Sequence, residues 1–298
     1  MIVHLIDGTY ELYRQHFGQA VRHSTPPPLA ATRGVVQSTL QLLTGGATHV
    51  AVAVDHVIES FRNNLYEGYK TSDGMEADIL DQLPIMEDAL RALGVVVWPM
   101  VKYEADDALA AGALIASDDP RVDQVQMLTP DKDLGQVVSG NRVVQYDRRN
   151  DVIINETAVI EKFGVGPASI ADWLGLVGDT ADGFPGLPGW GAKSAASVLS
   201  HYLHIDNIPD DPAQWAADGV TVRGAAKLAA TLEEKRALAD LFKVVATVVT
   251  DVSDDVPLGF VDDWEWRGPT KELAAIAKTL DMADLVERTE RAMVGRRN

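Results

Sequence analysis

Short apolar segments rich in β-branched residues alternate with helix-like segments through the first half of the chain. Turn-forming or charged residues bound the strand-like segments, which are 2–6, 49–54, 94–98, 124–129 and 142–145. The helical patterns between them occupy roughly 32–43, 77–93, 104–116 and 132–138. Strands that alternate with helices predict an α/β fold with a mostly parallel central sheet and flanking helices.

The second half of the chain has a different pattern. From about residue 155 onward it is mainly helical, with a turn-rich insert at 178–191 and a helix expected at 192–201. The segment 271–291 is typical of a surface helix that packs on one side and is solvated on the other. At 298 residues, the chain can hold one large α/β domain or two smaller ones.

Acidic residues fall where the predicted strands end. Asp7 ends the first strand, Asp55 ends the second, and Asp131 and Asp133 follow the strand that ends in Met-Leu-Thr. Because ligands collect at the carboxyl ends of strands in open α/β sheets, these acids are expected at one edge of the sheet. Each Asp taken alone has a structural alternative, since an Asp after a strand is usually a turn former or a helix cap.

A further acidic run, Tyr-Glu-Ala-Asp-Asp, occupies 103–107. If it opens a helix, Glu104 and Asp107 lie three residues apart on one face, with Asp106 beside them. Crowding so many like charges at one edge is costly unless a cation offsets them. An oxygen-only ligand set without His or Cys favours Mg²⁺ or Mn²⁺ over zinc. An acidic site that holds two metal ions serves in-line displacement at phosphorus.

The turn-rich insert combines acids, glycines and a lysine. Asp179 and Asp182 are candidates for a second group of metal ligands. The glycines of 186–191 allow backbone amides to approach a ligand, and the helix that follows would direct Lys193 in its first turn toward a phosphate. Such contacts grip a nucleic-acid backbone without reading its sequence. Turns of this composition are otherwise simple connectors between helices.

Basic and aromatic residues follow the second strand at 61–70. Arg62 and Lys70 are candidates to hold a reacting phosphate and to offset charge in the transition state. Tyr69 is a candidate to stack on a base. The alternative is a solvated helix face.

The formal net charge of −18 opposes nucleic-acid binding, because such proteins usually present a basic surface. Metal ions would neutralise buried ligand carboxylates, but removing nine of these still leaves −9. Contacts with DNA must therefore come from a few placed Lys and Arg residues, amides and metal. The chain has no cysteine, which excludes disulfides and thiolate sites. We also expect no signal peptide, and no apolar run in the sequence is long enough for a membrane span.

Together these motifs resemble the 5′ nuclease family, which includes the 5′-3′ exonuclease domain of bacterial DNA polymerase I and stand-alone flap endonucleases. The matching segments run in family order from residue 1 to about 260. They are Leu-Ile-Asp-Gly at 5–8, Thr-Arg-Gly at 32–34, Phe-Arg with Tyr-Glu-Gly-Tyr-Lys at 61–70, Tyr-Glu-Ala-Asp-Asp at 103–107, Thr-Pro-Asp-Lys-Asp-Leu at 129–134, and Gly-Asp-x-x-Asp-x-x-Pro-Gly at 178–186.

The resemblance implies a PIN-like nuclease core at 1–165 with a helical arch near 66–86. It further implies a helix–three-turn–helix DNA-binding region at 166–260 and a C-terminal helical extension at 261–298. The implied metal ligands, some acting through water, are Asp7, Asp55, Glu104, Asp106, Asp107, Asp131, Asp133, Asp179 and Asp182. The implied catalytic residues are Lys70, Arg62, Asp7 and Asp133, and the implied DNA-binding residues are Arg33, Tyr69, Gly186, Gly189, Gly191 and Lys193.

The expected activity is structure-specific 5′-flap endonuclease and 5′-3′ exonuclease cleavage in replication and repair. It would need two or more Mg²⁺ or Mn²⁺ ions, with K⁺ expected at the 186–191 hairpin. The expected substrates are DNA with 5′ ends, flaps, nicks or gaps, and RNA-primer remnants. We expect a stand-alone, cytoplasmic, nucleoid-associated monomer that does not bind membranes.

Some positions depart from the family pattern. Asp73 replaces an arch Arg, Gly183 replaces an Asn, and Pro188 replaces a hairpin Lys. These changes affect DNA grip and spare the proposed ligands. A non-catalytic DNA-structure binder and a PIN-type ribonuclease remain alternatives. A phosphatase of the haloacid dehalogenase type is disfavoured because Leu5 stands where its nucleophilic Asp would be.

Overall fold

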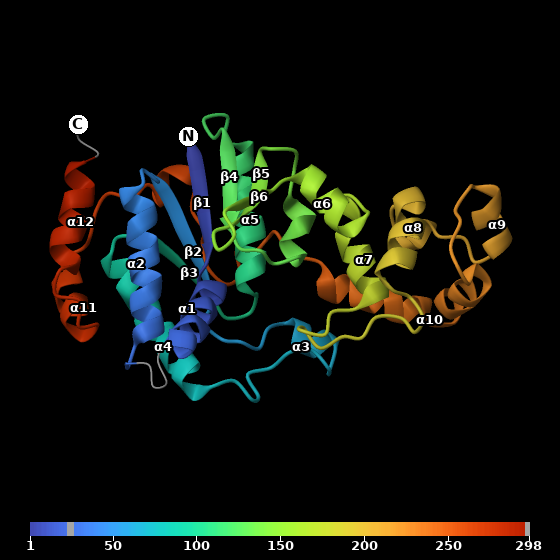
Figure 1. Cartoon of the computed structure of the whole chain (residues 1–298), viewed down its shortest axis with the longest axis horizontal. Coiled ribbons are helices and arrows are strands. Elements are labelled where there is room, and N and C mark those ends of the chain that lie inside the picture. The colour runs from blue at the N-terminus through green and yellow to red at the C-terminus, as the bar shows by residue number, and fades with distance from the viewer. Residues whose placement is uncertain (23–26, 296–298) are drawn as a thin grey trace. The chain divides into compact units, whose positions relative to one another are not determined.

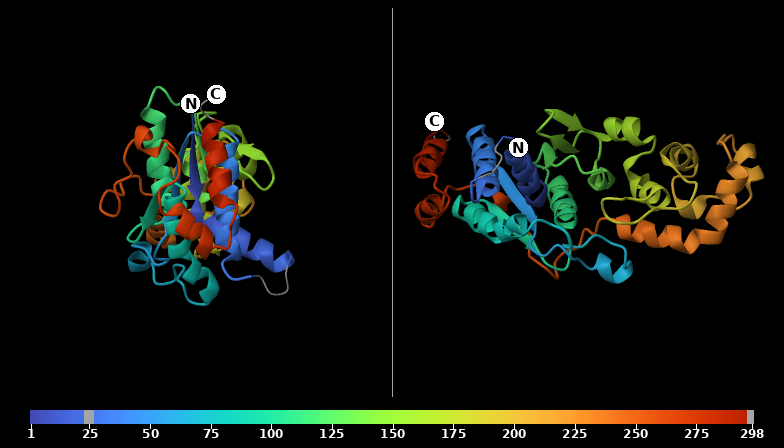
Figure 2. Two further views of the ribbon diagram at one scale, coloured as in Figure 1. Left: turned by 90° about the vertical axis from the view of Figure 1, so that its left-hand side faces the viewer. Right: turned by 60° about the horizontal axis from the view of Figure 1, so that its bottom comes forward.

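The computed structural model describes residues 1–22 and 27–295. The chain divides into two compact units, and each unit is assembled from separate stretches of sequence. The first unit comprises Met1–Ile58, Ser72–Thr129 and the segment from Val249 onward. The second unit comprises Glu59–Thr71 and Pro130–Val248. Each is described by itself, and its elements can be followed by colour in Figures 1 and 2.

The first unit is built on four parallel strands. They are β1 (Ile2–Asp7), β2 (His49–Asp55), β3 (Val96–Met100) and β4 (Gln124–Leu128), in the order β3-β2-β1-β4. Ile6 lies opposite Val52 on one side and Leu128 on the other. The four predicted strands of this unit are confirmed, and their apolar runs are explained because a parallel sheet is buried on both faces.

Helices cover both faces of this sheet. They are α1 (Gly8–Arg22), α2 (Ala30–Thr44), α4 (Ala77–Ala92) and α5 (Ala105–Asp118). α1, α2 and α4 contact one another, while α5 contacts the strands. Right-handed crossovers place the first three on one face and α5 on the other, because the chain moves outward from β1 to β3 and then returns to β4. The carboxyl ends of β1 and β2 therefore lie together at one edge.

The segment 66–86, where a helical arch is expected, is helical only from Ala77 onward. Turns and coil occupy 66–76, after the short helix α3 (Arg62–Leu65). Gly68 and Gly74 lie in this stretch, and glycine is a poor helix former.

The end of the first unit contains η4 (Val261–Trp264), α11 (Leu273–Thr279) and α12 (Leu285–Val294). The prediction of one helix over 271–291 is wrong, because α11 and α12 are separate. Asp281 lies between them with φ of 52°, a left-handed backbone that cannot continue a right-handed helix.

The second unit is mainly helical. Its two strands, β5 (Val143–Asp147) and β6 (Val152–Ile154), are antiparallel. Its further elements are η1 (Asp133–Val137), α6 (Glu156–Phe163), η2 (Pro167–Ser169), α7 (Ile170–Val177), α8 (Ala192–Tyr202), η3 (Ile205–Asn207), α9 (Pro212–Ala217) and α10 (Ala225–Ala246). The helix predicted at 132–138 is the 3₁₀ segment η1, since Gly135 and the β-branched Val137 weaken α-helix formation in so short a stretch.

Buried aromatic side chains fix the turn-rich insert on α10. The Phe184 ring lies 5.5 Å from that of Phe242, and Trp190 Nε1 donates to the Leu228 carbonyl at 3.2 Å. α7 also packs along α10. The insert is therefore fixed to α10 at its middle and at its C-terminal end. Among the described residues, no helix has the length and apolar character that crossing a membrane requires.

Candidate metal centre and nucleic-acid interface

Asp7 is the last residue of β1, and both of its carboxylate oxygens accept hydrogen bonds. Its side chain is 6% exposed. Oδ1 accepts a hydrogen bond from the Tyr10 amide at 2.8 Å, and Oδ2 accepts one from Thr129 Oγ1 at 3.0 Å. Gly8 follows it where a Cβ would approach the Ala53 carbonyl oxygen to 2.8 Å. The Asp-Gly pair of the first motif thus combines a fixed carboxylate with a close approach between β1 and β2.

Asp55, at the end of β2, connects to the start of α5. Its Oδ1 accepts a hydrogen bond from the Ala105 amide at 2.7 Å. Its own amide donates to Thr9 Oγ1 at 2.8 Å. These bonds link the ends of two neighbouring strands to the acidic segment 104–107.

Glu104 and Asp107 form a capping box at the start of α5. Asp107 Oδ2 accepts from the Glu104 amide at 3.0 Å, and the Glu104 side chain accepts from the Asp107 backbone. Asp107 Oδ1 also accepts from the Val249 amide at 2.7 Å, and its side chain has 0% exposure. Glu104 and Asp107 therefore do act as helix-capping residues, which was the structural alternative to metal binding in the sequence. Asp106, in the same turn, is partly exposed.

Three acids of the second unit converge. Asp133 lies at the start of η1, and Asp179 and Asp182 lie in the turn after α7. Each of the three offers a carboxylate oxygen within 4.8 Å of the other two. Asp131 is adjacent, because its Oδ1 accepts from the Asp133 amide at 2.9 Å. Two groups of acids that lie far apart in sequence thus meet in one cluster, named here the acid triad after Asp133, Asp179 and Asp182.

Two glycines make the turn that carries Asp179 and Asp182. Gly178 and Gly186 have φ of 85° and 69°, and a Cβ on Gly186 would come within 2.4 Å of the Gly178 amide nitrogen. Between them, Asp179 and Phe184 exchange backbone hydrogen bonds of 2.8 and 3.0 Å. Only glycine fits this close contact with a positive φ. The spacing of the motif therefore reflects a tight turn that presents two carboxylates.

The electrostatics of the acid triad fit a bound cation. Burial, followed by the charges of Asp131 and Asp182, raises the pKa of Asp133 well above its usual value. Asp133 Oδ1 is buried and has no hydrogen-bond partner among the residues that the structure describes. A hard divalent ion would satisfy this oxygen and relieve the repulsion between carboxylates.

Lys132 partly offsets the charge of the acid triad. Its Nζ forms an ion pair with Asp179 and lies 4.0 Å from Asp133 Oδ1. Burial acts to lower the pKa of Lys132, but the carboxylates of Asp133 and Asp179 outweigh it, and the pKa is raised. The lysine therefore stays protonated, as a counter-ion should.

Lys70 reaches the acid triad, and the guanidinium of Arg62 bonds to carbonyl groups at the end of α10. Lys70 Nζ forms an ion pair with Asp182 Oδ1 at 3.0 Å, and the Lys70 amide donates to the Asp182 carbonyl at 2.9 Å. Arg62 is 3% exposed, and its guanidinium donates to the carbonyls of Val245 and Thr247 at 2.8 and 2.9 Å.

Tyr69 is 5% exposed, so its ring offers no face to a base in this conformation.

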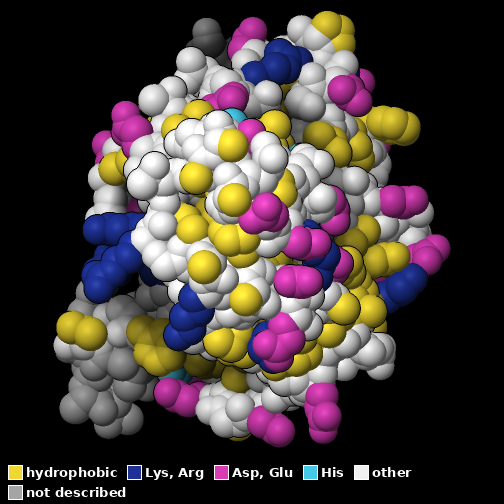
Figure 3. All heavy atoms as spheres, turned by 90° about the vertical axis from the view of Figure 1, so that its right-hand side faces the viewer, with side chains coloured by type: hydrophobic (Ala, Val, Ile, Leu, Met, Phe, Trp, Pro, Cys, Tyr) yellow, Lys and Arg dark blue, Asp and Glu magenta, His cyan; other side chains and the backbone are white. Residues whose placement is uncertain are grey.

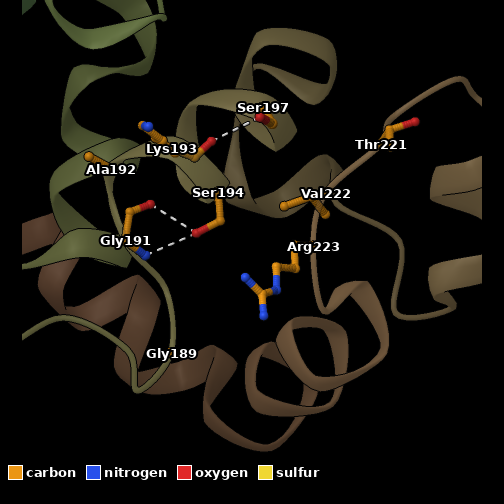
Figure 4. Close-up of a pocket in the computed structure, with 9 residues that line it drawn as sticks. All are labelled: Gly189, Gly191, Ala192, Lys193, Ser194, Ser197, Thr221, Val222 and Arg223. Atoms are coloured by element: carbon orange, nitrogen blue, oxygen red, sulfur yellow. Dashed lines mark hydrogen bonds between the residues drawn. The ribbon is translucent and has the colours of Figure 1, made fainter.

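A separate cavity of about 500 Å³ lies in the second unit, at the start of α8 (Figure 4). Gly189, Gly191 and Lys193 line it, as three of the predicted DNA-binding residues. Its other lining residues are Ala192, Ser194, Ser197, Thr221, Val222 and Arg223. The other three predicted residues lie elsewhere. Tyr69 is buried, Gly186 belongs to the tight turn, and Arg33, in the first unit, donates to the Leu280 carbonyl at 3.1 Å.

Arg223 is the cation of this cavity that sequence reasoning missed. Figure 4 shows its guanidinium extending toward Gly191 and Ser194, whereas the Lys193 side chain is directed away from it. The Gly191 amide is not free for a ligand, because it donates to Ser194 Oγ at 2.9 Å. No sequence signal marks Arg223, since it lies 30 residues beyond Lys193 and only the packing of α10 brings the two segments together.

Neither Lys193 nor Arg223 forms an ion pair within the described part of the chain, and both are exposed. Some other basic residues of this unit are paired: Arg236 with Asp210 at 2.6 Å, and Lys243 with Asp172 at 2.9 Å. Figure 3 shows Asp and Glu side chains scattered over one face of the molecule, with Lys and Arg side chains in a few separate groups. Lys193 and Arg223 therefore place two exposed cations beside the cavity.

A parallel α/β unit with acids at its strand ends, and a helical unit with an acid triad, define a nuclease-type architecture. Residues 2–164 match the family "5′-3′ exonuclease, N-terminal resolvase-like domain", and residues 165–272 match "5′-3′ exonuclease, C-terminal SAM fold". The chain belongs to the 5′-3′ exonuclease family. This confirms the identification made from the motifs, and it confirms the predicted fold class.

Relatives of known name agree with this membership. The chain is 32% identical to a 5′-3′ exonuclease of Aquifex aeolicus, over 69% of this chain and 71% of that protein. It is 34% identical to DNA polymerase I of Pseudomonas aeruginosa, over 85% of this chain and 28% of that protein. The chain thus spans only 23% to 32% of the length of these polymerase relatives.

Solved structures share the fold. T5 D15 protein co-crystallised with metal ions superposes with a TM-score of 0.68 at 16% identity, covering 95% of this chain and all of that one. The catalytic core of Rad2 in complex with a DNA substrate superposes with a TM-score of 0.60 at 15% identity, covering 97% of this chain and 91% of that one. At such identity the likeness concerns the fold alone.

Proposed function

We propose that this chain is a structure-specific 5′ nuclease that hydrolyses phosphodiester bonds in DNA and depends on divalent metal. The observation that carries the proposal is the acid triad with Lys70 beside it, in a chain of the 5′-3′ exonuclease family. The proposed activities are 5′-flap endonuclease and 5′-3′ exonuclease cleavage that leaves a 5′-phosphate. The proposed substrates are DNA with 5′ ends, flaps, nicks or gaps, and RNA-primer remnants.

The proposed metal ligands belong to two groups. In the first unit they are Asp7, Asp55, Glu104, Asp106 and Asp107, some acting through water. In the second unit they are Asp131, Asp133, Asp179 and Asp182. Two or more Mg²⁺ or Mn²⁺ ions, when bound, would activate a water molecule and stabilise charge on the reacting phosphate. The buried Asp133 oxygen without a hydrogen-bond partner among the described residues supports a cation in the second group.

Side chains beside the acids would position the phosphate. Lys70 is proposed to contact it and offset its charge, because Lys70 already lies against Asp182. Arg62 is the second proposed contact. In the structure its guanidinium ties the segment before Lys70 to the end of α10, so the same residue would also hold that segment in place.

The cavity at the start of α8 is proposed to grip duplex DNA. Lys193 and Arg223 would each contact a backbone phosphate, and the hairpin 186–191 would supply backbone groups and a K⁺ site. Such contacts hold a duplex without reading bases, and they make binding depend on salt. Arg33 would contact DNA from the first unit. We further propose the division into a core at 1–165, a DNA-binding region at 166–260 and an extension at 261–298, acting as a nucleoid-associated monomer.

The first experiment is cleavage of an end-labelled 5′-flap duplex with and without Mn²⁺ or Mg²⁺, with the cut position mapped. We expect a cut at or next to the flap junction only when metal is present. Binding without cleavage in either metal would support the non-catalytic DNA-structure binder instead. Equal cleavage of a structureless RNA would support the PIN-type ribonuclease.

A further inference from the structure

One carboxylate oxygen gathers three successive backbone amides in the first unit. Asp255 Oδ2 accepts hydrogen bonds from the amides of Val101, Lys102 and Tyr103 at 2.9, 2.7 and 2.9 Å. Consecutive N–H groups that point at one place form a concave site for an anion. Here a side chain from a distant part of the sequence fills that site.

These amides belong to the segment that leads into the acidic turn. Residues 101–103 join the end of β3 to Glu104, which caps α5. The far side of the same turn is held from the same stretch of chain, because the Val249 amide donates to Asp107 Oδ1 at 2.7 Å. The stretch 249–255 therefore grips the segment 101–107 at both of its ends.

The neighbouring acid makes a different kind of contact. Within the described residues, the one side-chain contact of Asp254 is an exposed ion pair with Lys102 Nζ at 2.7 Å. Exposed ion pairs between flexible side chains restrain little. Bonds from three adjacent amides to one charged oxygen are charge-assisted, and they fix the backbone itself. Of the two acids, Asp255 thus determines where the loop lies.

We infer that Asp255 is a positioning residue that sets the geometry of Glu104 and Asp106 for metal binding. The inference rests on the proposed function, because it takes these two acids as ligands. Groups that orient ligands from outside the ligand set alter metal affinity strongly when they are removed. Without Asp255, the amides of 101–103 lose their common acceptor. The loop before Glu104 would then adopt more than one conformation, and the position of Glu104 would vary with it.

The test is Mn²⁺ affinity, measured from the electron paramagnetic resonance signal of free Mn²⁺ without DNA. All variants carry Asp182→Asn, which removes one carboxylate of the acid triad. The measured Mn²⁺ affinity then reports on the acids of the first unit. We expect Asp255→Ala to weaken Mn²⁺ binding about tenfold. Asp255→Asn keeps an acceptor oxygen and should stay within about threefold. Asp254→Ala is the matched control, and we expect a change of less than about twofold.

Unchanged Mn²⁺ affinity in Asp255→Ala, or an equal loss in Asp254→Ala, overturns the inference and leaves the proposed function intact. If Asp255→Ala does not fold, as judged by circular dichroism, Asp255→Glu takes its place. That variant keeps the charge and displaces the carboxylate by one methylene, and wild-type affinity in it also overturns the inference. Absence of Mn²⁺ binding in the protein with all acids intact would instead overturn the proposed metal site.

Discussion

The acids of the first unit are held by backbone amides, whereas in the acid triad of the second unit lysines form ion pairs with the carboxylates, beside one amide hydrogen bond from Ala181 to Asp179. Asp7, Asp55 and Asp107 each accept at least one amide hydrogen bond of 2.7 to 3.0 Å. In the acid triad, Lys132 and Lys70 form ion pairs with Asp179 and Asp182, and Asp133 keeps a buried oxygen without a hydrogen-bond partner among the described residues.

This difference shows two ways to keep carboxylates close together. Hydrogen bonds from fixed amides stabilise a charged carboxylate whether or not metal is bound. A buried cluster of like charges keeps an electrostatic repulsion that a bound metal ion relieves. The first group should therefore stabilise the fold by itself, and the acid triad should destabilise it until a cation binds.

The largest effect is expected from Asp133→Ala. We expect loss of cleavage by at least roughly a hundredfold to a thousandfold, because metal stabilisation of transition-state charge contributes several kcal/mol. Affinity for flap DNA should stay within a few-fold. Single-turnover cleavage and fluorescence anisotropy measure the two quantities. Glu233→Gln, which removes an exposed acid of the same unit, is the control. Full activity of Asp133→Ala would remove the metal assignment from the acid triad.

Asp133→Asn tests the stored repulsion directly. Burial and nearby carboxylates raise the pKa of Asp133 in the folded protein. Between the unfolded value, about 3.9, and that raised pKa, the folded protein binds more protons than the unfolded chain, so stability falls as pH rises. We expect the variant to be more stable than wild type by roughly 1 to 2 kcal/mol at pH 8 without metal, with the gap closing toward pH 4.

Urea unfolding in EDTA across this pH range measures the effect. Added Mg²⁺ should stabilise wild type more than the variant, because ligand binding to the folded state adds to its stability. A wild-type protein that is the more stable of the two at pH 8 in EDTA would contradict the account of the acid triad.

Arg223→Gln and Lys193→Ala extend the comparison to the basic cavity. Each should weaken duplex binding about tenfold and reduce the slope of log affinity against log salt by about one, as expected when one phosphate contact is lost. Turnover of bound substrate should change less than affinity. Arg149→Gln is the matched control, because Arg149 is an exposed cation of the same unit outside the cavity. Unchanged affinity in both variants would refute the assignment of the cavity to DNA.

The smallest effect is expected from Thr129→Val in the first unit. The substitution keeps the shape of the side chain and removes the hydrogen bond to Asp7 Oδ2. We expect a loss of about 1 kcal/mol in the free energy of unfolding, with or without metal. Thr129→Val should thus lower the free energy of unfolding, whereas Asp133→Asn should raise it, and the two variants together test the comparison. Thr279→Val, at an exposed helix position of the same unit, is the control. A gain in stability in Thr129→Val would contradict the conclusion that the acids of the first unit stabilise the fold.

The sequence alone determined the class of fold and the family. Apolar runs that alternate with helical patterns give the parallel strands, since burial on both faces demands such runs. The spacing in 178–186 reflects local backbone geometry, because Gly178 and Gly186 must have positive φ and lie in contact. Apolar runs and glycine spacing are local features, and local features can be recognised in a sequence.

Only the tertiary structure decided which other interactions the candidate side chains make. Glu104 and Asp107 look like equal ligand candidates in sequence, and both also take part in a helix cap, while Arg62 also donates to the carbonyls of Val245 and Thr247. Arg223 and Asp255 carry no motif, and they gain their places through contacts with segments far away in the sequence. Hydrogen bonds over such separations depend on packing, which no local pattern records.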